Sequence, residues 1–159
     1  MMKVLVTGTS TGIGRGIAEK FLAEGHTVIG LDVAESTIAH ENYAHYIADV
    51  ACPEQLPAVE GVEILINNAG VQDSGRDIDV NLRGTIYCTE KYGIQPNIKS
   101  IVMTASVSAH NGAEFPEYCA SKGGVLAYTK NVALRVAKYG ATCNSISAGG
   151  VITELNAHI

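Results

Sequence analysis

The chain has 159 residues, which suits one domain, and its 47% hydrophobic content and 17 glycines fit a compact α/β protein. Eleven basic and 16 acidic residues give a formal net charge of −5. Because the basic residues form no cluster, we expect a small-molecule ligand, with neither nucleic acid nor an anionic membrane surface as a partner.

The first segment predicts a strand, a glycine-rich loop and a helix. Residues 2–7 form an aliphatic, β-branched run typical of a buried strand. Ile13, Ile17 and Phe21 recur every four residues and indicate an amphipathic helix over 13–24, which Gly25 ends. Between strand and helix, backbone amides can approach a pyrophosphate, whose charge suits a helix N-terminus. The predicted phosphate loop consists of Gly8, Thr9, Ser10, Thr11, Gly12, Ile13 and Gly14.

An acidic residue ends the second predicted strand, residues 27–31. Asp32 stands eighteen residues after Gly14, where a carboxylate can bind both ribose hydroxyls and repel a 2′-phosphate. Thr11 and Val33, which would flank the ribose, are not basic, and Arg15 is the one nearby cation. These residues favour NAD as the cofactor, and an NADP-linked reductase is the less favoured alternative.

Further strands are predicted near 45–48, 62–67, 98–105 and 141–147, with helices near 77–92 and 117–139. Residues 53–60, between the third and fourth strands, leave space for barely two helical turns. This alternation predicts one domain over 1–159 with a three-layer, Rossmann-like, doubly wound parallel sheet. Right-handed crossovers then gather the motifs at the carboxyl ends of the strands.

A tyrosine and a lysine four residues apart, Tyr118 and Lys122, would meet on one face of the last helix. A neighbouring cation favours the phenolate and lowers a phenol pKa from its ordinary value of about 10, which enables proton transfer. The spacing alone is common on helix surfaces, so its meaning depends on the motifs upstream.

Together, these motifs resemble those of the short-chain dehydrogenase/reductase family, the tyrosine-dependent oxidoreductases. Residues 7–14 are similar to the family's cofactor motif, and residues 67–70 (Asn-Asn-Ala-Gly) to the motif that ends its fourth strand. The resemblance implies that Asp49, followed by Val50, accepts a hydrogen bond from the adenine amino group. It also implies that the adenosine ribose is lined by Asn68, Ala69 and Gly70.

The resemblance further implies a catalytic set of four residues. Tyr118 would be the general acid/base, and Lys122 would lower its pKa and hold the nicotinamide ribose. Ser106 would bind the substrate oxygen, with Ser108 as the less favoured candidate for that role. Asn81 would bend its helix and position a water molecule for proton relay.

Three segments depart from the family pattern. Residues 148–153 resemble Pro-Gly-x-x-x-Thr with Ala148 in place of proline, so the resemblance places Val151 and Thr153 at the nicotinamide. The segment from Ser106 to Tyr118 is one residue shorter than usual, and residues 70–81 are too few for the usual helix. The sequence ends at residue 159, before the family's substrate lid, further helix and seventh strand, so we expect a sheet truncated after the sixth strand.

The sequence thus predicts an NAD(H)-dependent oxidoreductase that transfers a hydride between nicotinamide and a secondary alcohol or ketone. The alternative is an NAD-binding protein without turnover, or an incomplete family member. Family resemblance implies a homodimer or homotetramer. Four scattered cysteines predict reduced thiols and no metal site. With no signal peptide and no apolar run near ~18 residues, we expect a cytoplasmic protein.

Overall fold

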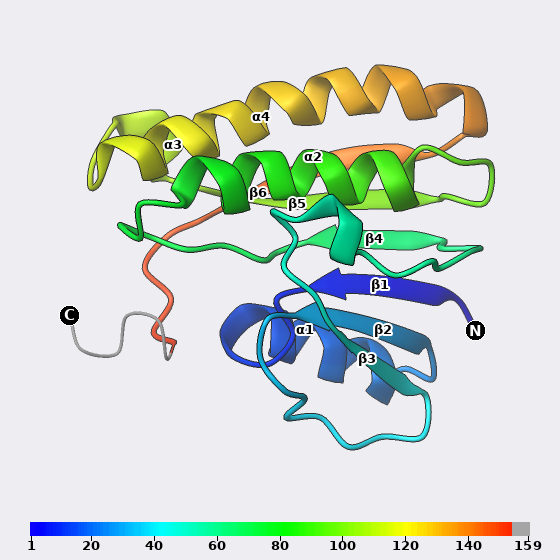
Figure 1. Ribbon diagram of the computed structural model, residues 1–159. Helices are drawn as coiled ribbons and strands as arrows, with labels where there is room; N and C mark the ends of the chain where they lie inside the picture. The colour runs from blue at the N-terminus through cyan, green and yellow to red at the C-terminus, as the bar shows by residue number, and fades with distance from the viewer. Residues whose placement is uncertain (154–159) are drawn as a thin grey trace.

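A six-stranded parallel sheet forms the centre of the computed structural model, which describes residues 1–153 (Figure 1). Its order is β3-β2-β1-β4-β5-β6, so the chain reverses direction across the sheet at β1, as the doubly wound prediction requires. The last six residues of the predicted domain lie outside the described residues. The strands are β1 (Lys3–Thr7), β2 (Thr27–Asp32), β3 (Tyr43–Ile47), β4 (Ile64–Asn67), β5 (Ser100–Ser106) and β6 (Thr142–Ala148).

Helices cover both faces of the sheet, which confirms the predicted three layers. The helix α1 (Gly12–Ala23) packs on one face, and α2 (Thr85–Cys88) and α4 (Pro116–Val136) lie on the other (Figure 1). The π-helical segments η2 (Ile78–Gly84) and η3 (Thr89–Gly93) extend α2 in both directions. The remaining short helices are η1 (Pro53–Gln55), α3 (Ser108–Asn111) and η4 (Ala137–Tyr139).

Two hydrophobic cores separate the layers because successive strand residues point to opposite faces. In β1, Leu5 enters the core beneath α4, whereas Val4 and Val6 enter the core beneath α1. Both faces of the central strands are therefore buried, which explains why these strands read as continuous apolar runs. From the helices, the cores receive Val125 and Val132 of α4 on one side and Ala18 and Leu22 of α1 on the other.

The helix predicted over residues 77–92 is present, but most of it is π-helical rather than α-helical. The hydroxyl of Thr85 donates to the carbonyl of Asn81 at 2.7 Å, and that of Thr89 donates to the carbonyl of Thr85 at the same distance. Gly84 lets the helix approach the segment after β3 closely, because a Cβ there would lie 2.6 Å from a methyl carbon of Val50. The wide turn of η2 thus carries Asn81.

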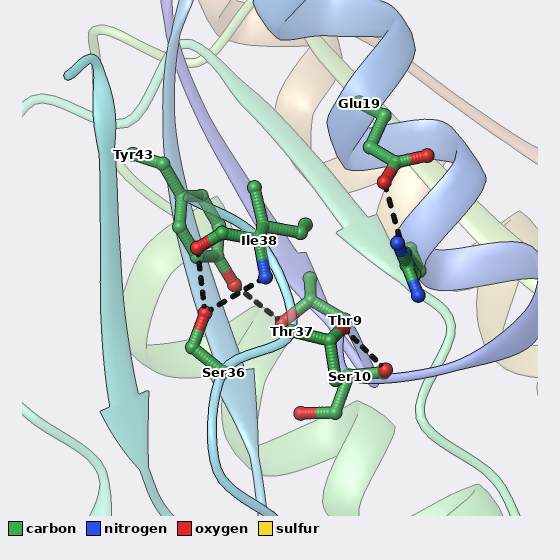
Figure 2. A network of polar contacts seen from close by, with 8 residues as sticks. Thr9, Ser10, Glu19, Ser36, Thr37, Ile38 and Tyr43 are labelled. Atoms are coloured by element: carbon green, nitrogen blue, oxygen red, sulfur yellow. Dashed lines mark hydrogen bonds and ion pairs between the residues drawn. The ribbon is translucent and has the colours of Figure 1, made fainter. Parts of the chain in front are cut away.

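Residues 33–42, between β2 and β3, form no helix and are instead held by polar contacts (Figure 2). The hydroxyl of Thr37 donates to the carbonyl of Ser10 at 2.7 Å, and the hydroxyls of Thr9 and Tyr43 are hydrogen-bonded at 2.8 Å. Tyr43 lies over Gly30, where a Cβ would be 2.0 Å from the phenol oxygen. Residues 33–42 and β3 therefore hold the glycine loop in place through hydrogen bonds to Thr9 and Ser10.

The described residues also bear on the expectations about membranes, metals and thiols. None of their helices is long and apolar enough to cross a membrane. The same residues contain no group of three or more His, Cys, Asp or Glu side chains that could hold a metal ion. All four cysteines are unpaired, and burial raises the thiol pKa of Cys88 to about 12 and that of Cys143 to about 11.

Candidate active site

A cleft of about 380 Å³ lies at the carboxyl ends of the strands. It extends from the end of β2, past the glycine loop, to the first turns of α4, and this is the expected ligand position in a doubly wound sheet. Most residues predicted for the site line it: Gly8, Thr11, Gly12, Ile13, Asp32, Asp49, Val50, Asn68, Ala69, Gly70, Ser106, Tyr118, Lys122, Val151 and Thr153.

Four of the predicted residues lie behind the cleft lining: Thr9, Ser10, Gly14 and Asn81. Thr9 and Ser10 are buried; Thr9 is hydrogen-bonded to Tyr43 of β3, and Ser10 contacts the loop between β2 and β3. A Cβ on Gly14 would lie 1.9 Å from the carbonyl oxygen of Gly8, so this glycine permits close packing of helix and loop. The structure gives these residues supporting positions, and direct contact with a cofactor stays a prediction for them.

The glycine loop is fixed to the end of β4 through the hydroxyl of Thr7. That oxygen accepts hydrogen bonds from the backbone amides of Asn68 at 3.0 Å and Ala69 at 2.9 Å. The side-chain amide of Asn68 donates to the carbonyl of Thr7 at 3.2 Å. Gly8 and Gly12 have φ values of +77° and +55°, a conformation that glycine adopts without steric cost. The motifs of residues 7–14 and 67–70 are therefore joined directly by hydrogen bonds.

At one end of the cleft, the carboxylate of Asp32 is held in place by the backbone. It accepts hydrogen bonds from the amides of Ser10 at 2.9 Å and Ala34 at 3.0 Å. Arg15 instead forms an ion pair with Glu19 along the surface of α1, at 2.9 Å. Near Asp32, the described cleft lining thus presents a fixed negative charge.

Arg76 is a cleft residue that the sequence did not reveal. Its guanidinium forms an ion pair with Asp49 at 2.7 Å, and the other carboxylate oxygen accepts from the amide of Ala51 at 2.9 Å. Burial acts to raise the pKa of Asp49, but the hydrogen bonds from Arg76 and Ala51 together bring it below the ordinary value. Arg76 belongs to the short connection after β4, and no residue spacing places it opposite Asp49.

At the other end of the cleft, Ser106, Tyr118 and Lys122 lie together. Ser106 and Tyr118 line the cleft together, and the hydroxyl oxygen of Ser106 accepts from the backbone amide of Ser108 at 3.1 Å. The ammonium of Lys122 lies 5.8 Å from the centre of the Tyr118 ring and donates to the carbonyl of Thr104 at 2.8 Å. Of the two candidate serines, Ser106 is therefore the one that lines the described cleft with Tyr118.

Burial dominates the electrostatics of this pair. The pKa of Lys122 falls to about 8 because burial disfavours its ammonium, an effect that the charge of Asp77 opposes. Burial also raises the pKa of Tyr118, with the hydrogen bond from Ser106 acting in the opposite direction and the charge of Glu114 adding to the rise. Burial therefore determines the direction of the Tyr118 pKa in the protein alone, and the lowering of the phenol pKa by Lys122 stays a prediction.

Asn81 joins the loop after β4 to α4. Its side-chain oxygen accepts from the amide of Val71 at 2.8 Å, and its nitrogen donates to the carbonyl of Val71 at 2.9 Å and to the hydroxyl of Ser121 at 3.0 Å. Its position within a π-helical segment agrees with the predicted irregularity of this helix. Both polar groups of its side chain are engaged by the protein, so the water-binding role stays a prediction.

Comparison with known proteins is consistent with this geometry. The short chain dehydrogenase family profile matches residues 2–159. A 3-oxoacyl-[acyl-carrier-protein] reductase of Vibrio cholerae is 31% identical over 182 residues, covering 95% of this chain and 74% of that protein. An uncharacterized oxidoreductase of Bacillus subtilis, YxbG, is 34% identical over 188 residues, covering 95% and 67%. The chain thus spans about two thirds to three quarters of the length of these relatives.

Solved structures show the same arrangement. The ligand-free aldohexose dehydrogenase of Thermoplasma acidophilum is 33% identical and superposes with a TM-score of 0.87, covering 97% of this chain and 68% of its own. A 3-oxoacyl-[acyl-carrier protein] reductase of Brucella melitensis, solved with NAD, is 28% identical with a TM-score of 0.86, covering 98% and 76%. The chain therefore belongs to the short-chain dehydrogenase family, oxidoreductases with a Rossmann fold that binds a nicotinamide cofactor.

Proposed function

We propose that the protein is an NAD(H)-dependent oxidoreductase that transfers a hydride between nicotinamide and a secondary alcohol or ketone, with Tyr118 as the general acid/base. The observation that carries this proposal is the grouping of Ser106, Tyr118 and Lys122 at one end of a cleft whose other end presents Asp32. Residues for proton transfer and for ribose binding thus share one elongated site.

The cleft residues fit a dinucleotide. Gly8 and Gly12 give the loop a backbone that side chains would obstruct, and a Cβ on Gly8 would lie 2.9 Å from the Cα of Ala69. Asp32 is anionic and fixed, which favours two ribose hydroxyls over a 2′-phosphate and hence NAD over NADP. When bound, nicotinamide supplies the hydride acceptor or donor.

The proton moves at the phenol oxygen of Tyr118. In ketone reduction the phenol donates its proton to the substrate oxygen, and in alcohol oxidation the phenolate accepts it. Ser106 receives a hydrogen bond from the amide of Ser108, which leaves its own proton for the phenol or the substrate oxygen. That donor stabilises negative charge developing on the substrate oxygen. Burial keeps the phenol protonated at neutral pH in the protein alone, a state that suits proton donation to a ketone.

The alternative, an NAD-binding protein without turnover, requires the same cleft but gives Tyr118 no chemical role. The test is a Tyr118→Phe variant compared with Tyr128→Phe, whose phenol lies on the same helix and bonds to Glu90 at 2.9 Å. We expect Tyr118→Phe to bind NADH normally and to lose about 10²- to 10⁴-fold in kcat with any alcohol that the wild type oxidises. Tyr128→Phe should turn over like the wild type.

Two results would contradict the proposal. Full activity in Tyr118→Phe would remove the assigned acid/base. If the wild type binds NADH and yet oxidises no secondary alcohol and reduces no ketone, the non-catalytic alternative is correct.

A further inference from the structure

One carboxylate, that of Glu114, lies at the substrate end of the cleft. Glu114 lines the cleft together with Ser106 and Tyr118. Its Oε2 accepts hydrogen bonds from the hydroxyl of Ser108 at 3.1 Å and from the side-chain amide of Gln72 at 3.3 Å. Among the described residues, Oε1 has no hydrogen-bond partner. One oxygen is thus anchored by the protein, and the other is an available acceptor.

The backbone at this position is strained. Glu114 has a φ of +74°, in the left-handed region that a residue with a side chain seldom adopts. A glycine would adopt this conformation without strain, so local backbone structure does not account for glutamate here. Strained residues cluster at ligand-binding sites, where surrounding contacts hold them. The contacts with Ser108 and Gln72 are of this kind, because they fix the carboxylate from two separate segments.

The charges in the cleft leave Glu114 without a cationic partner. Of the residues that line the described cleft, Arg76 and Lys122 are the cations. Arg76 pairs with Asp49 at the other end, and Lys122 is buried and bonded to the carbonyl of Thr104. A substrate at Tyr118 therefore meets a hydrogen-bond-accepting, negatively charged surface.

We propose that Glu114 determines substrate specificity, and that it favours neutral substrates with a second hydroxyl next to the reacting carbinol, as in vicinal diols and sugars. This inference rests on the function proposed above. A carboxylate accepts strong hydrogen bonds from hydroxyl donors, repels an anionic substrate, and is poorly solvated beside a hydrocarbon. During oxidation the carbinol hydrogen leaves as hydride to the nicotinamide and the hydroxyl proton goes to Tyr118. The second hydroxyl remains unchanged and serves only for binding.

The test compares cyclohexane-1,2-diol with cyclohexanol, which differ by the one hydroxyl in question. For Glu114→Gln we expect the ratio of kcat/KM for the diol to kcat/KM for cyclohexanol to fall about tenfold, through the loss of one charge-assisted hydrogen bond. The charge of Glu114 also acts on the pKa of Tyr118, but this effect is common to both substrates and cancels in the ratio. An anionic analogue, 2-hydroxycyclohexanecarboxylate, should become a better substrate in the same variant. Glu117→Gln, an exposed residue outside the cleft lining, is the matched control and should leave all three substrates as in the wild type.

A binding measurement separates this inference from the proposed function. With NADH present, the diol should raise the melting temperature of the wild type and of Glu117→Gln, but not that of Glu114→Gln. If wild type and Glu114→Gln show the same diol-to-cyclohexanol ratio, the role of Glu114 is overturned while the oxidoreductase assignment stands. If no alcohol is turned over but the diol stabilises only proteins that retain Glu114, the oxidoreductase assignment is overturned while the binding role of Glu114 stands. Without turnover and without stabilisation by the diol, both are overturned.

Discussion

Lys122 occupies a position that is costly for a cation. Only 4% of the residue is exposed, and its ammonium donates a hydrogen bond to a neutral carbonyl, that of Thr104. The charge of Asp77 supports the ammonium, but burial outweighs it and the pKa falls to about 8. A side chain that reduces stability in this way persists where function requires it.

The cost of burying Lys122 predicts a pH dependence of stability. The native pKa of about 8 lies below the ordinary lysine value of 10.5, so the unfolded chain binds more protons between these values. The free energy of unfolding attributable to Lys122 should therefore rise with pH across this interval, by about 3 kcal/mol in total. Denaturant unfolding of wild type and Lys122→Met at about pH 7 and about pH 10 measures this. If the free energies of unfolding of wild type and Lys122→Met differ by the same amount at both pH values, the lowered pKa assigned to Lys122 is contradicted.

At the residue scale, sequence spacing was sufficient for side chains held by local motifs. Asp32 and Ser106 end strands, and Tyr118 lies in the first turn of a helix, at positions that motif spacing identifies; all three line the cleft. Arg76 and the direction of the Tyr118 pKa were not predictable in this way. Both depend on tertiary placement: one on an ion pair between distant segments, the other on burial.

At the element scale, two of the three glycines of α1, Gly14 and Gly16, have opposite requirements. A Cβ on Gly14 would lie 1.9 Å from the carbonyl oxygen of Gly8, whereas a Cβ on Gly16 would have nothing within 4 Å. Gly14→Ala should therefore displace the glycine loop, lower stability and weaken NADH binding. Gly16→Ala should stabilise the helix by about 0.5–1 kcal/mol, because alanine loses less backbone entropy.

Denaturant midpoints and NADH fluorescence titrations of the two variants test this prediction. Gly16→Ala controls for the added methyl group, since it lies on the same helix two residues away. The close contacts of Gly14 with Gly8 and Asn68 predict that an added Cβ displaces the loop. If Gly14→Ala binds NADH as tightly as the wild type, this prediction is wrong.

The positions of the elements were predictable, but the winding of one helix was not. Each strand boundary lies within two residues of its predicted position, because apolar runs and flanking glycines mark strand ends clearly. Apolar periodicity predicted the helix over 77–92 but cannot distinguish α- from π-helical turns. In the structure the wide turns accompany hydroxyl bonds from Thr85 and Thr89, together with packing of Gly84 on Val50.

At the scale of the whole molecule, β1 pairs with both β2 and β4, so the two ends of the cleft belong to one sheet. We expect a single unfolding transition, as for one cooperative domain. Saturating NADH should stabilise the native state, by about 2.7 kcal/mol at a hundred times its Kd. At equal concentrations NADPH should raise the melting temperature less, because Asp32 opposes its 2′-phosphate.

Thermal unfolding followed by circular dichroism, with and without each cofactor, gives both results. A larger shift with NADPH would reverse the assignment of Asp32, and two separate transitions would contradict the single predicted domain.

The homodimer or homotetramer and the cytoplasmic location stay predictions. Leu134 on α4 is 80% exposed, which makes the outer face of this helix the first candidate for a subunit interface. Sedimentation measures the oligomeric state.

The contact between Gly30 and Tyr43 has a consequence for evolution. The phenol occupies the space above Gly30 and reaches Thr9, and its oxygen also lies 2.8 Å from Nδ1 of His45. Any larger residue at position 30 therefore requires a smaller one at position 43, which would leave Thr9 without this partner. We expect the three positions to covary among close homologues, so that glycine on β2 and tyrosine on β3 are inherited together.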